Sequence, residues 1–546
     1  MSANPTSEEI ERREIQQFES RIDDLHLNLE LLRYPKNLAL WSIVTNGLER
    51  LYQAQTPQVP ERDRTLQSVI SRSIGVYLRK TSDYPFKGHT AIKNLRLDPH
   101  VREAAVEANE YARFWFAATG YFPEWHQREV SASVIGPKSI RFSLTATKRQ
   151  RALSAYQKSF RPSPMRIPAQ TVYAPIPEWI NAEYLRALSP GTTHDRRLVY
   201  RIPQSVYEYY RDWYAQKMRE AVEHPVETDL GAYDIGDAIS FWSSLAAFSS
   251  VHDYLCYVAG LRTQLPLNSI LQIRRRTDWA EELARLSGLA DTKCDAILER
   301  IICRSRSVID LHVTPFLALD EKTAWLALAT PLAISGRFDQ NLLRICSAED
   351  PDRFNRITPK KEQKLRDEIF SETAPLQIRC LGPFSLPSPL PDVDLVLEDP
   401  HDDTLVVSEL KWVRPPIGWK SRHRANNELQ HGAEQLRQIR EFLLAHPDYL
   451  AARRGGISKP ISQFKNLYHA VLTRGHLIHV EPKSSESMIP LDAFKHALKS
   501  EGHLAAAMEW LLSDSWLPKE GVDFKIQNSH FRHQGYLIEA PVFIPS

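Results

Sequence analysis

The residues best suited to chemistry lie in one short stretch, 391-PDVDLVLEDPHDDTLVVSELKW-412. Residues 392–409 hold seven acidic side chains and no Lys or Arg, and Lys411 then follows Glu409 by two positions. Two apolar runs, DLVL and TLVVSEL, flank an acidic turn. The pattern predicts a buried hairpin that carries carboxylates and a lysine. Charges buried in this way require partners.

Strand geometry determines which of these side chains meet. Side chains two residues apart in a strand point to the same face, so Glu409 and Lys411 share a face. Antiparallel pairing of 393–398 with 404–411 about the acidic turn places Asp394 opposite Glu409. Such cross-strand neighbours have Cβ atoms about 5 Å apart. We therefore expect two carboxylates and one ammonium group to converge.

This convergence predicts a site for phosphodiester hydrolysis. Two close carboxylates repel each other, and a divalent cation relieves the repulsion. Oxygen ligands with room for water suit Mg²⁺ or Mn²⁺, which we expect Asp394 and Glu409 to bind. The metal would polarise a phosphate and activate water. Lys411 would orient or help deprotonate the attacking water and stabilise negative charge as it develops.

The arrangement resembles the core motif of the PD-(D/E)XK nuclease superfamily, which has the restriction-endonuclease-like fold. Asp394 precedes an apolar strand, and the E-L-K triplet follows on the next strand at 409–411. The resemblance covers roughly residues 355–480. Residues 391–392 also match the letters PD, so Asp392 remains an alternative metal ligand, although strand register favours Asp394.

The resemblance implies further site residues and a function. Superfamily members often carry an acid on the helix before the hairpin, which Glu368 or Glu362 would match. Several branches have a glutamine on the helix after it, for which Gln435 is the first choice and Gln430 the second. The implied activity is a Mg²⁺-dependent endo- or exonuclease acting on DNA, with RNA as an alternative, in restriction, anti-phage defence or repair. The alternative from another class is a non-catalytic nucleic-acid-binding or scaffold protein built on this fold.

A basic segment follows the motif directly. Residues 411–424 contain five Lys or Arg side chains, two tryptophans and no acid. Basic side chains bind phosphates and aromatic rings stack on bases, so the segment predicts nucleic-acid contacts. The alternative is a solvated loop. The expected contact residues are Arg414, Trp419, Lys420, Arg422 and Arg424.

The rest of the chain predicts a large, mainly helical region before an α/β domain. Amphipathic helical patterns span residues 7–34, 36–54, 62–80 and 99–119. Strand patterns flank a DEK turn within 309–335, and from 358 the order is helix, strand, strand, helix, strand. The expected domains are a helical region at 1–160, a proline-rich linker at 161–177, a second helical region at 178–305, a nuclease-like mixed sheet flanked by helices at 306–490 and a C-terminal extension at 491–546.

Composition limits the class of protein. A chain of 546 residues with 42% hydrophobic and 25% charged residues is typical of a soluble protein of two to four domains. The net charge of +2 excludes a uniformly basic protein. The polar N-terminus and the lack of long apolar runs predict a cytoplasmic protein without membrane contact. We also expect the helical region to offer a surface for a protein partner or a second copy.

Overall fold

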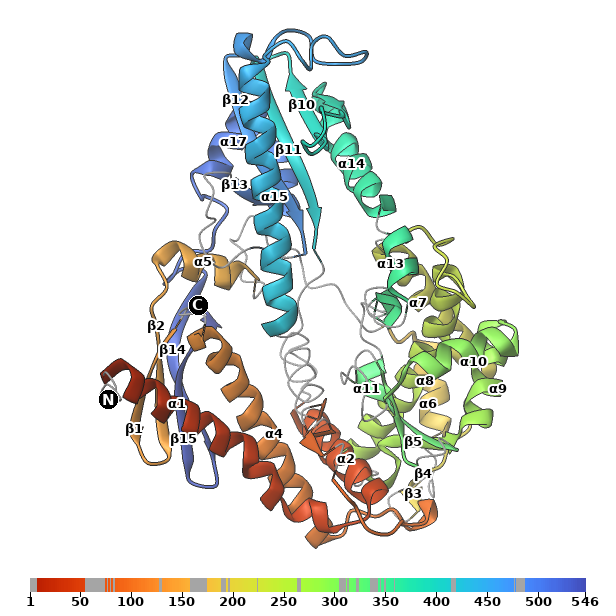
Figure 1. The fold of residues 1–546 in the computed structure, drawn as a ribbon. Coiled ribbons are helices and arrows are strands. Elements are labelled where there is room, and N and C mark those ends of the chain that lie inside the picture. The colour runs from red at the N-terminus through yellow and green to blue at the C-terminus, as the bar shows by residue number, and fades with distance from the viewer. Residues whose placement is uncertain are drawn as a thin grey trace.

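The structure is a computed structural model of the chain. It describes residues 7–54, 74–75, 77–78, 80–81, 84–126, 130–157, 174–187, 193–194, 197–222, 224–262, 267–303, 311, 314–320, 324–333, 342–343, 345–347, 350–357, 359–413, 419–475, 477 and 487–546. It combines helices with mixed sheets, arranged as three units around the middle of the molecule (Figure 1).

The N-terminal unit is built on three long helices, α1 (Ser7–Asp24), α2 (Lys36–Ala54) and α4 (Pro99–His126). The helix expected at 7–34 ends as an α-helix at Asp24 and continues as the 3-10 turns η1 (Leu25–Asn28) and η2 (Glu30–Arg33), because Leu29 between the turns is extended. The expected helices at 36–54 and 99–119 are confirmed as α2 and α4. Most of the expected helix at 62–80 lies outside the described residues.

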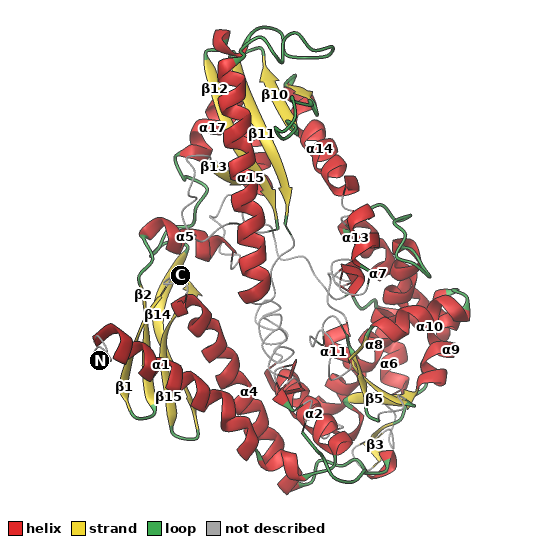
Figure 2. Ribbon diagram, viewed as in Figure 1, coloured by secondary structure: helices red, strands yellow, loops and turns green. Residues whose placement is uncertain are grey.

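A four-stranded sheet packs beside α1 and α4 and joins the two ends of the chain (Figure 2). The hairpin of β1 (Val130–Gly136) and β2 (Ser139–Leu144) was not expected within the helical region. The last strands, β14 (Phe524–His533) and β15 (Tyr536–Pro545), complete the sheet, with β15 parallel to β2. The Tyr536 ring lies 5.7 Å from that of Phe18 in α1. The C-terminal strands therefore belong to the N-terminal core.

The second unit is mainly helical, as expected for residues 178–305. Its helices and short strands are α6 (Glu178–Ala187), β3 (Thr193–His194), β4 (Arg197–Leu198), α7 (Gln204–Ala221), α8 (Ile235–Arg262), α9 (Arg276–Ser287), α10 (Asp291–Arg300) and α11 (Thr330–Ala333). A small sheet has the order β5 (Leu271–Arg275), β8 (Trp325–Ala329), β7 (Phe316–Ala318) and β6 (Ile302–Cys303). The strand pair expected around the DEK turn is confirmed as β7 and β8. Strand β5 was not expected.

The third unit is a five-stranded mixed sheet with helices on both faces. Its strand order is β13 (Ser487–Pro490), β12 (Asn466–Arg474), β11 (Thr404–Trp412), β10 (Leu395–Asp399) and β9 (Arg379–Leu381). Strands β11, β12 and β13 are parallel, whereas β9, β10 and β11 are antiparallel. Its helices are α14 (Pro359–Thr373), α15 (Trp419–Ala445), α16 (Leu491–Glu501) and α17 (Leu504–Leu512). The expected order of elements from 358 is present, with β9 added.

Two apolar cores hold the helices on this sheet. Val396, Leu405 and Val407 pack under α15 in one core. Leu395, Leu397 and Val406 pack in the other core, with residues of α14, α16, α17 and of α5 (Lys148–Gln157). Residues 491–517 thus complete the third unit and 524–545 complete the first, so the expected C-terminal extension divides between two units.

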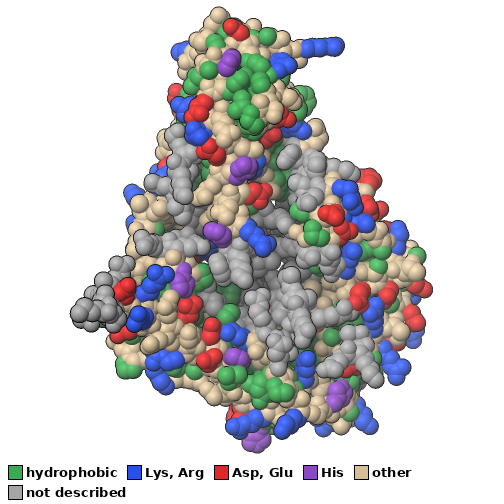
Figure 3. All heavy atoms as spheres, in the orientation of Figure 1, with side chains coloured by type: hydrophobic (Ala, Val, Ile, Leu, Met, Phe, Trp, Pro, Cys, Tyr) green, Lys and Arg blue, Asp and Glu red, His purple; other side chains and the backbone are tan. Residues whose placement is uncertain are grey.

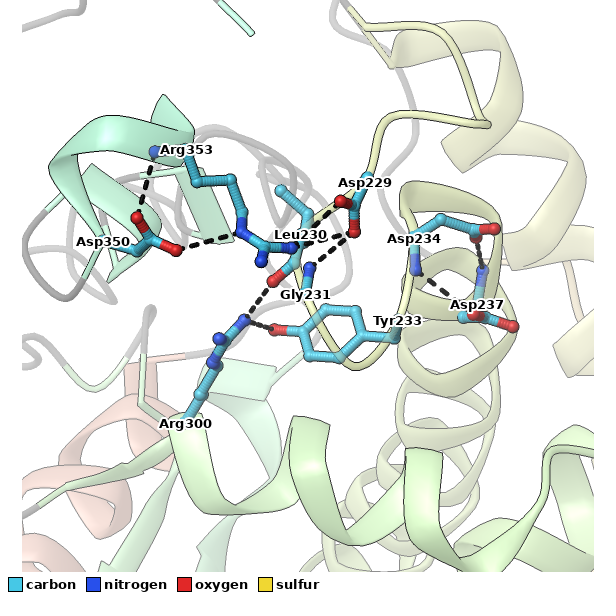
Figure 4. Close-up of polar contacts among 9 residues, drawn as sticks. All are labelled: Asp229, Leu230, Gly231, Tyr233, Asp234, Asp237, Arg300, Asp350 and Arg353. Carbon is cyan, nitrogen blue, oxygen red and sulfur yellow. Dashed lines mark hydrogen bonds and ion pairs between the residues drawn. The ribbon is translucent and has the colours of Figure 1, made fainter. Parts of the chain in front are cut away.

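The loop between α7 and α8 in the second unit forms an ion pair with α13 (Pro351–Ile357), as Figure 4 shows. Arg353 Nη1 donates to both carboxylate oxygens of Asp229 at 3.0 Å. Arg300 Nη1 donates to Leu230 O at 2.8 Å and to the Tyr233 hydroxyl at 3.0 Å. Gly231 between them has φ +111°, and a Cβ there would lie 3.2 Å from Arg353 Nη1. Only glycine allows this close approach without strain.

None of the helices in the described ranges is long and apolar enough to cross a membrane. The five cysteines are free, and four of them are buried.

The pairing of β15 with β2 predicts that β15 contributes to the stability of the N-terminal unit. Ile538 in β15 is 0% exposed and belongs to the N-terminal core. Its replacement by Ala should lower the free energy of unfolding by about 2–5 kcal/mol, because a cavity remains in the core. Val522, just before β14, is 68% exposed, so Val522→Ala should change little. Urea unfolding of both variants checks this, and equal, small effects would contradict the placement of β15.

Candidate active site

Register in the hairpin brings Asp394 to Glu409. Strands β10 and β11 pair Leu395 with Ser408, so the next step of the ladder places Asp394 opposite Glu409, and the expected register is confirmed. Asp394 Oδ2 also accepts a hydrogen bond from the backbone N–H of Leu410 at 2.9 Å. This bond ties the carboxylate to the neighbouring strand. Asp392, the alternative ligand, is exposed, whereas Asp394 is half-buried.

Side-chain alternation fixes the face on which the site lies. Leu405 and Val407 belong to the core under α15, and Glu409 and Lys411 continue that series along β11. Val396 belongs to the same core, two residues after Asp394. The two carboxylates and the lysine therefore share the face that α15 covers, at the end of β11 that points toward the middle of the molecule (Figure 1).

Glu409 is buried and interacts with a single cation among the described residues. Its side chain is 3% exposed, and its Oε1 accepts a hydrogen bond from Lys411 Nζ at 2.6 Å. Burial, together with the charge of Asp394, raises the pKa of Glu409 to about 7, although Lys411 acts in the opposite direction. The carboxyl group is thus poised to gain or lose a proton near neutral pH.

Three buried oxygens at the site lack a hydrogen-bond partner among the described residues: Glu409 Oε2, Gln435 Oε1 and Thr473 Oγ1. Buried polar atoms without partners are rare and are often completed by water or an ion. Carboxylate, amide and hydroxyl oxygens such as these and those of Asp394 are hard donors of the kind that Mg²⁺ and Mn²⁺ prefer. The donor set fits the expected metal.

Helix α15 positions Gln435 and the stem of Lys411. Gly432 contacts the Lys411 side chain, and Gln435 follows Gly432 by three residues, so both lie on one side of the helix. Gln430, the second choice, is two residues from Gly432 and points in a different direction. Helix geometry therefore places Gln435 on the side of α15 that faces Lys411, and its contact with the carboxylates stays a prediction.

Thr473 was not expected at the site. It is the parallel register partner of Lys411 and is 2% exposed. Its side chain shares the face of Val471, a member of the core under α15. Alternation along 467–473 indicates the face, but the sequence alone does not reveal which residue of β12 pairs with Lys411.

Glu368 does not join the other site residues. It accepts a hydrogen bond from Arg474 Nη1 at 2.9 Å and lies 3.8 Å from Lys495 Nζ. The Arg474 guanidinium lies 4.9 Å from the Trp412 ring, which packs against the opposite core. Glu368 is therefore held by two cations on the other face of the sheet, and the structure gives it no contact with Asp394 or Glu409. Its alternative, Glu362, lies in α14, and its side chain is outside the described part.

The expected nucleic-acid contacts are only partly described. Arg414 lies outside the described residues, and Trp419 and Lys420 open α15 with side chains that are not described. Arg422 Nη1 lies 3.1 Å from Glu124 Oε1 in α4, so it forms an ion pair within the chain. Arg424 is exposed. On the face seen in Figure 3, described side chains of both charges intermingle.

A second acidic group lies at the opposite end of the hairpin. Ligand atoms of Asp399, Asp402 and His503 lie within 4.8 Å of one another. Asp399 Oδ2 accepts the N–H of Leu504 at 3.1 Å, and Asp402 Oδ2 accepts that of Ala505 at 2.7 Å. These carboxylates thus cap the first turn of α17, which explains their position without a metal.

Comparisons of this chain with protein-family models, with curated proteins and with solved structures found no match. The likeness to the PD-(D/E)XK nucleases therefore depends on the residues and their geometry.

The raised pKa of Glu409 predicts how stability depends on pH in metal-free protein. Between pH 4.5 and about 7 the folded chain binds this proton and the unfolded chain does not. The free energy of unfolding should therefore fall as pH rises through this range, by up to roughly 3 kcal/mol from this group. Glu409→Gln should flatten the fall. Urea unfolding in EDTA at pH 5, 6, 7 and 8 measures it, and equal slopes in both proteins would contradict the assignment.

Proposed function

We propose that the protein is a metal-dependent nuclease of the PD-(D/E)XK type that hydrolyses phosphodiester bonds. The observation that carries the proposal is the convergence of Asp394, Glu409 and Lys411 on one face of the sheet, beside buried oxygens without partners. Element order from α14 to β12 supports the likeness to that superfamily. A bound Mg²⁺ or Mn²⁺ would polarise the phosphate and offset the charge of the leaving group.

The side chains at the site would have different roles in the reaction. Asp394 and Glu409 would hold the metal, with the carbonyl oxygen of Gln435 available as a further acceptor nearby. Lys411 Nζ, now bonded to Glu409, would turn its N–H groups to the attacking water and to the phosphate oxygens as charge grows on them. The burial of Glu409 strengthens its interactions with a neighbouring cation.

DNA is the favoured substrate by the likeness to the superfamily, and restriction, anti-phage defence and repair are roles by analogy. Arg424 near the start of α15 is exposed and so is available for phosphate contacts. Arg422 would have to leave Glu124 before it could bind a phosphate.

One observation favours a non-catalytic alternative. The ion pair between Lys411 and Glu409 neutralises the buried carboxylate without a metal, so the fold does not need a cation to be stable. A scaffold of this kind would bind nucleic acid or a partner without cutting it. The two functions differ in their dependence on metal and on Lys411.

Cleavage assays test the proposal. Purified protein should cut labelled DNA in Mg²⁺ or Mn²⁺ and not in EDTA, and single-stranded, duplex and circular DNA and RNA identify the substrate. Lys411→Ala should slow cleavage by about 100-fold or more, because it removes the ammonium group that would orient the attacking water and stabilise charge on the phosphate oxygens.

Two variants control this experiment. Lys459 also pairs with an acid, Asp403, at the opposite end of the same hairpin, so Lys459→Ala should cut at the wild-type rate. Glu368→Gln should also retain cleavage, because its carboxylate lies on the other face of the sheet. Cutting by Lys411→Ala at the wild-type rate would contradict the proposed site.

A further inference from the structure

Gly432 lies in the interior of α15 and faces the stem of Lys411. A Cβ built at Gly432 would lie 2.7 Å from Lys411 Cε, 3.0 Å from Cγ and 3.4 Å from Cδ. Three carbons of the lysine therefore run along the space that a side chain would fill. Glycine is a poor helix former in the interior of a helix, so its presence here calls for a reason.

Residues close to Gly432 in α15 differ from it because they carry side chains that fill the core. Leu429, Ala433 and Leu436 carry ordinary apolar side chains into the core under α15. At Gly432 the helix backbone approaches β11 closely enough to cover the lysine, whose side chain is only 16% exposed.

The far end of Lys411 is fixed as well. Its Nζ lies 2.6 Å from Glu409 Oε1, so the stem passes from β11 beneath Gly432 to a fixed partner. A methyl group at residue 432 would force the stem aside and move Nζ away from Glu409. The carboxylates of Asp394 and Glu409 would keep their positions, because β10 and β11 hold them.

We propose that Gly432 is a positioning residue: its missing side chain forms the slot that holds the Lys411 stem and so places Nζ at the reacting groups. The inference rests on the proposed nuclease function for its role in cleavage. The packing itself does not depend on that function.

Gly432→Ala tests the role in cleavage. A displacement of the lysine by about 1 Å should slow metal-dependent cutting by about 100-fold, while calorimetry should show Mn²⁺ binding at the wild-type affinity. Gly120→Ala is the matched control, because Gly120 lies in helix α4 with nothing within 4 Å of an added Cβ. Cutting by Gly432→Ala at the rate of the control would overturn the inference and leave the nuclease proposal intact.

A thermal double-mutant cycle with Lys411→Ala tests the slot without any assay of cleavage. In the wild-type background the crowded stem should make Gly432→Ala lower the unfolding midpoint. In the Lys411→Ala background the lysine stem is absent. Gly432→Ala should then leave the unfolding midpoint unchanged or raise it, because Ala is a better helix former than Gly. Equal shifts in the two backgrounds would overturn the inference even if the wild type cut nothing. If Gly432→Ala alone did not fold, the double variant should be at least as stable as Lys411→Ala, and a double variant less stable than Lys411→Ala would overturn the inference.

Discussion

The buried carboxylate of Glu409 is the constraint on which the third unit depends. A carboxylate that is 3% exposed beside a second acid requires a cation, and Lys411 provides one at 2.6 Å. Removing one partner of a buried ion pair typically costs about 3–5 kcal/mol, because the other charge is left alone. A protein that only needed a stable hairpin would gain by placing apolar side chains here. The buried charges give less stability than apolar side chains would, as expected for a functional site.

The surroundings of this pair follow from the need to hold it. The hairpin register places Asp394 against Glu409, and the bond from the Leu410 N–H fixes the second carboxylate. Helix α15 covers the lysine closely, and β12 adds the hydroxyl of Thr473 from the other side. On the opposite face, Glu368 and Arg474 form their own ion pair, which packs against Trp412. The ring of His224 lies 5.5 Å from that of Trp412, so the second unit contacts the strand one residue beyond the lysine.

Local pattern was sufficient to predict the hairpin, its register and the helix after it, because alternation and turn position are properties of neighbouring residues. The position of Glu368 was not predictable in this way, since the partner that holds it, Arg474, is distant in sequence. Likewise, β2, which forms a hairpin with β1, pairs with β15 at the far end of the chain. Their buried–exposed alternation was a usable signal, but no local signal names such a distant partner. A glycine inside a predicted helix was a signal for the close contact at Gly432, although the residue it contacts is on another element.

Binding of Mn²⁺ by the 546-residue chain is the most direct test of the central claim that Asp394 and Glu409 form a metal site. Calorimetry should show binding to the wild type and to Asp402→Asn, a variant of the acidic group that caps α17, and no binding to Glu409→Ala. Binding that persists in Glu409→Ala, or that is lost only in Asp402→Asn, would contradict the account.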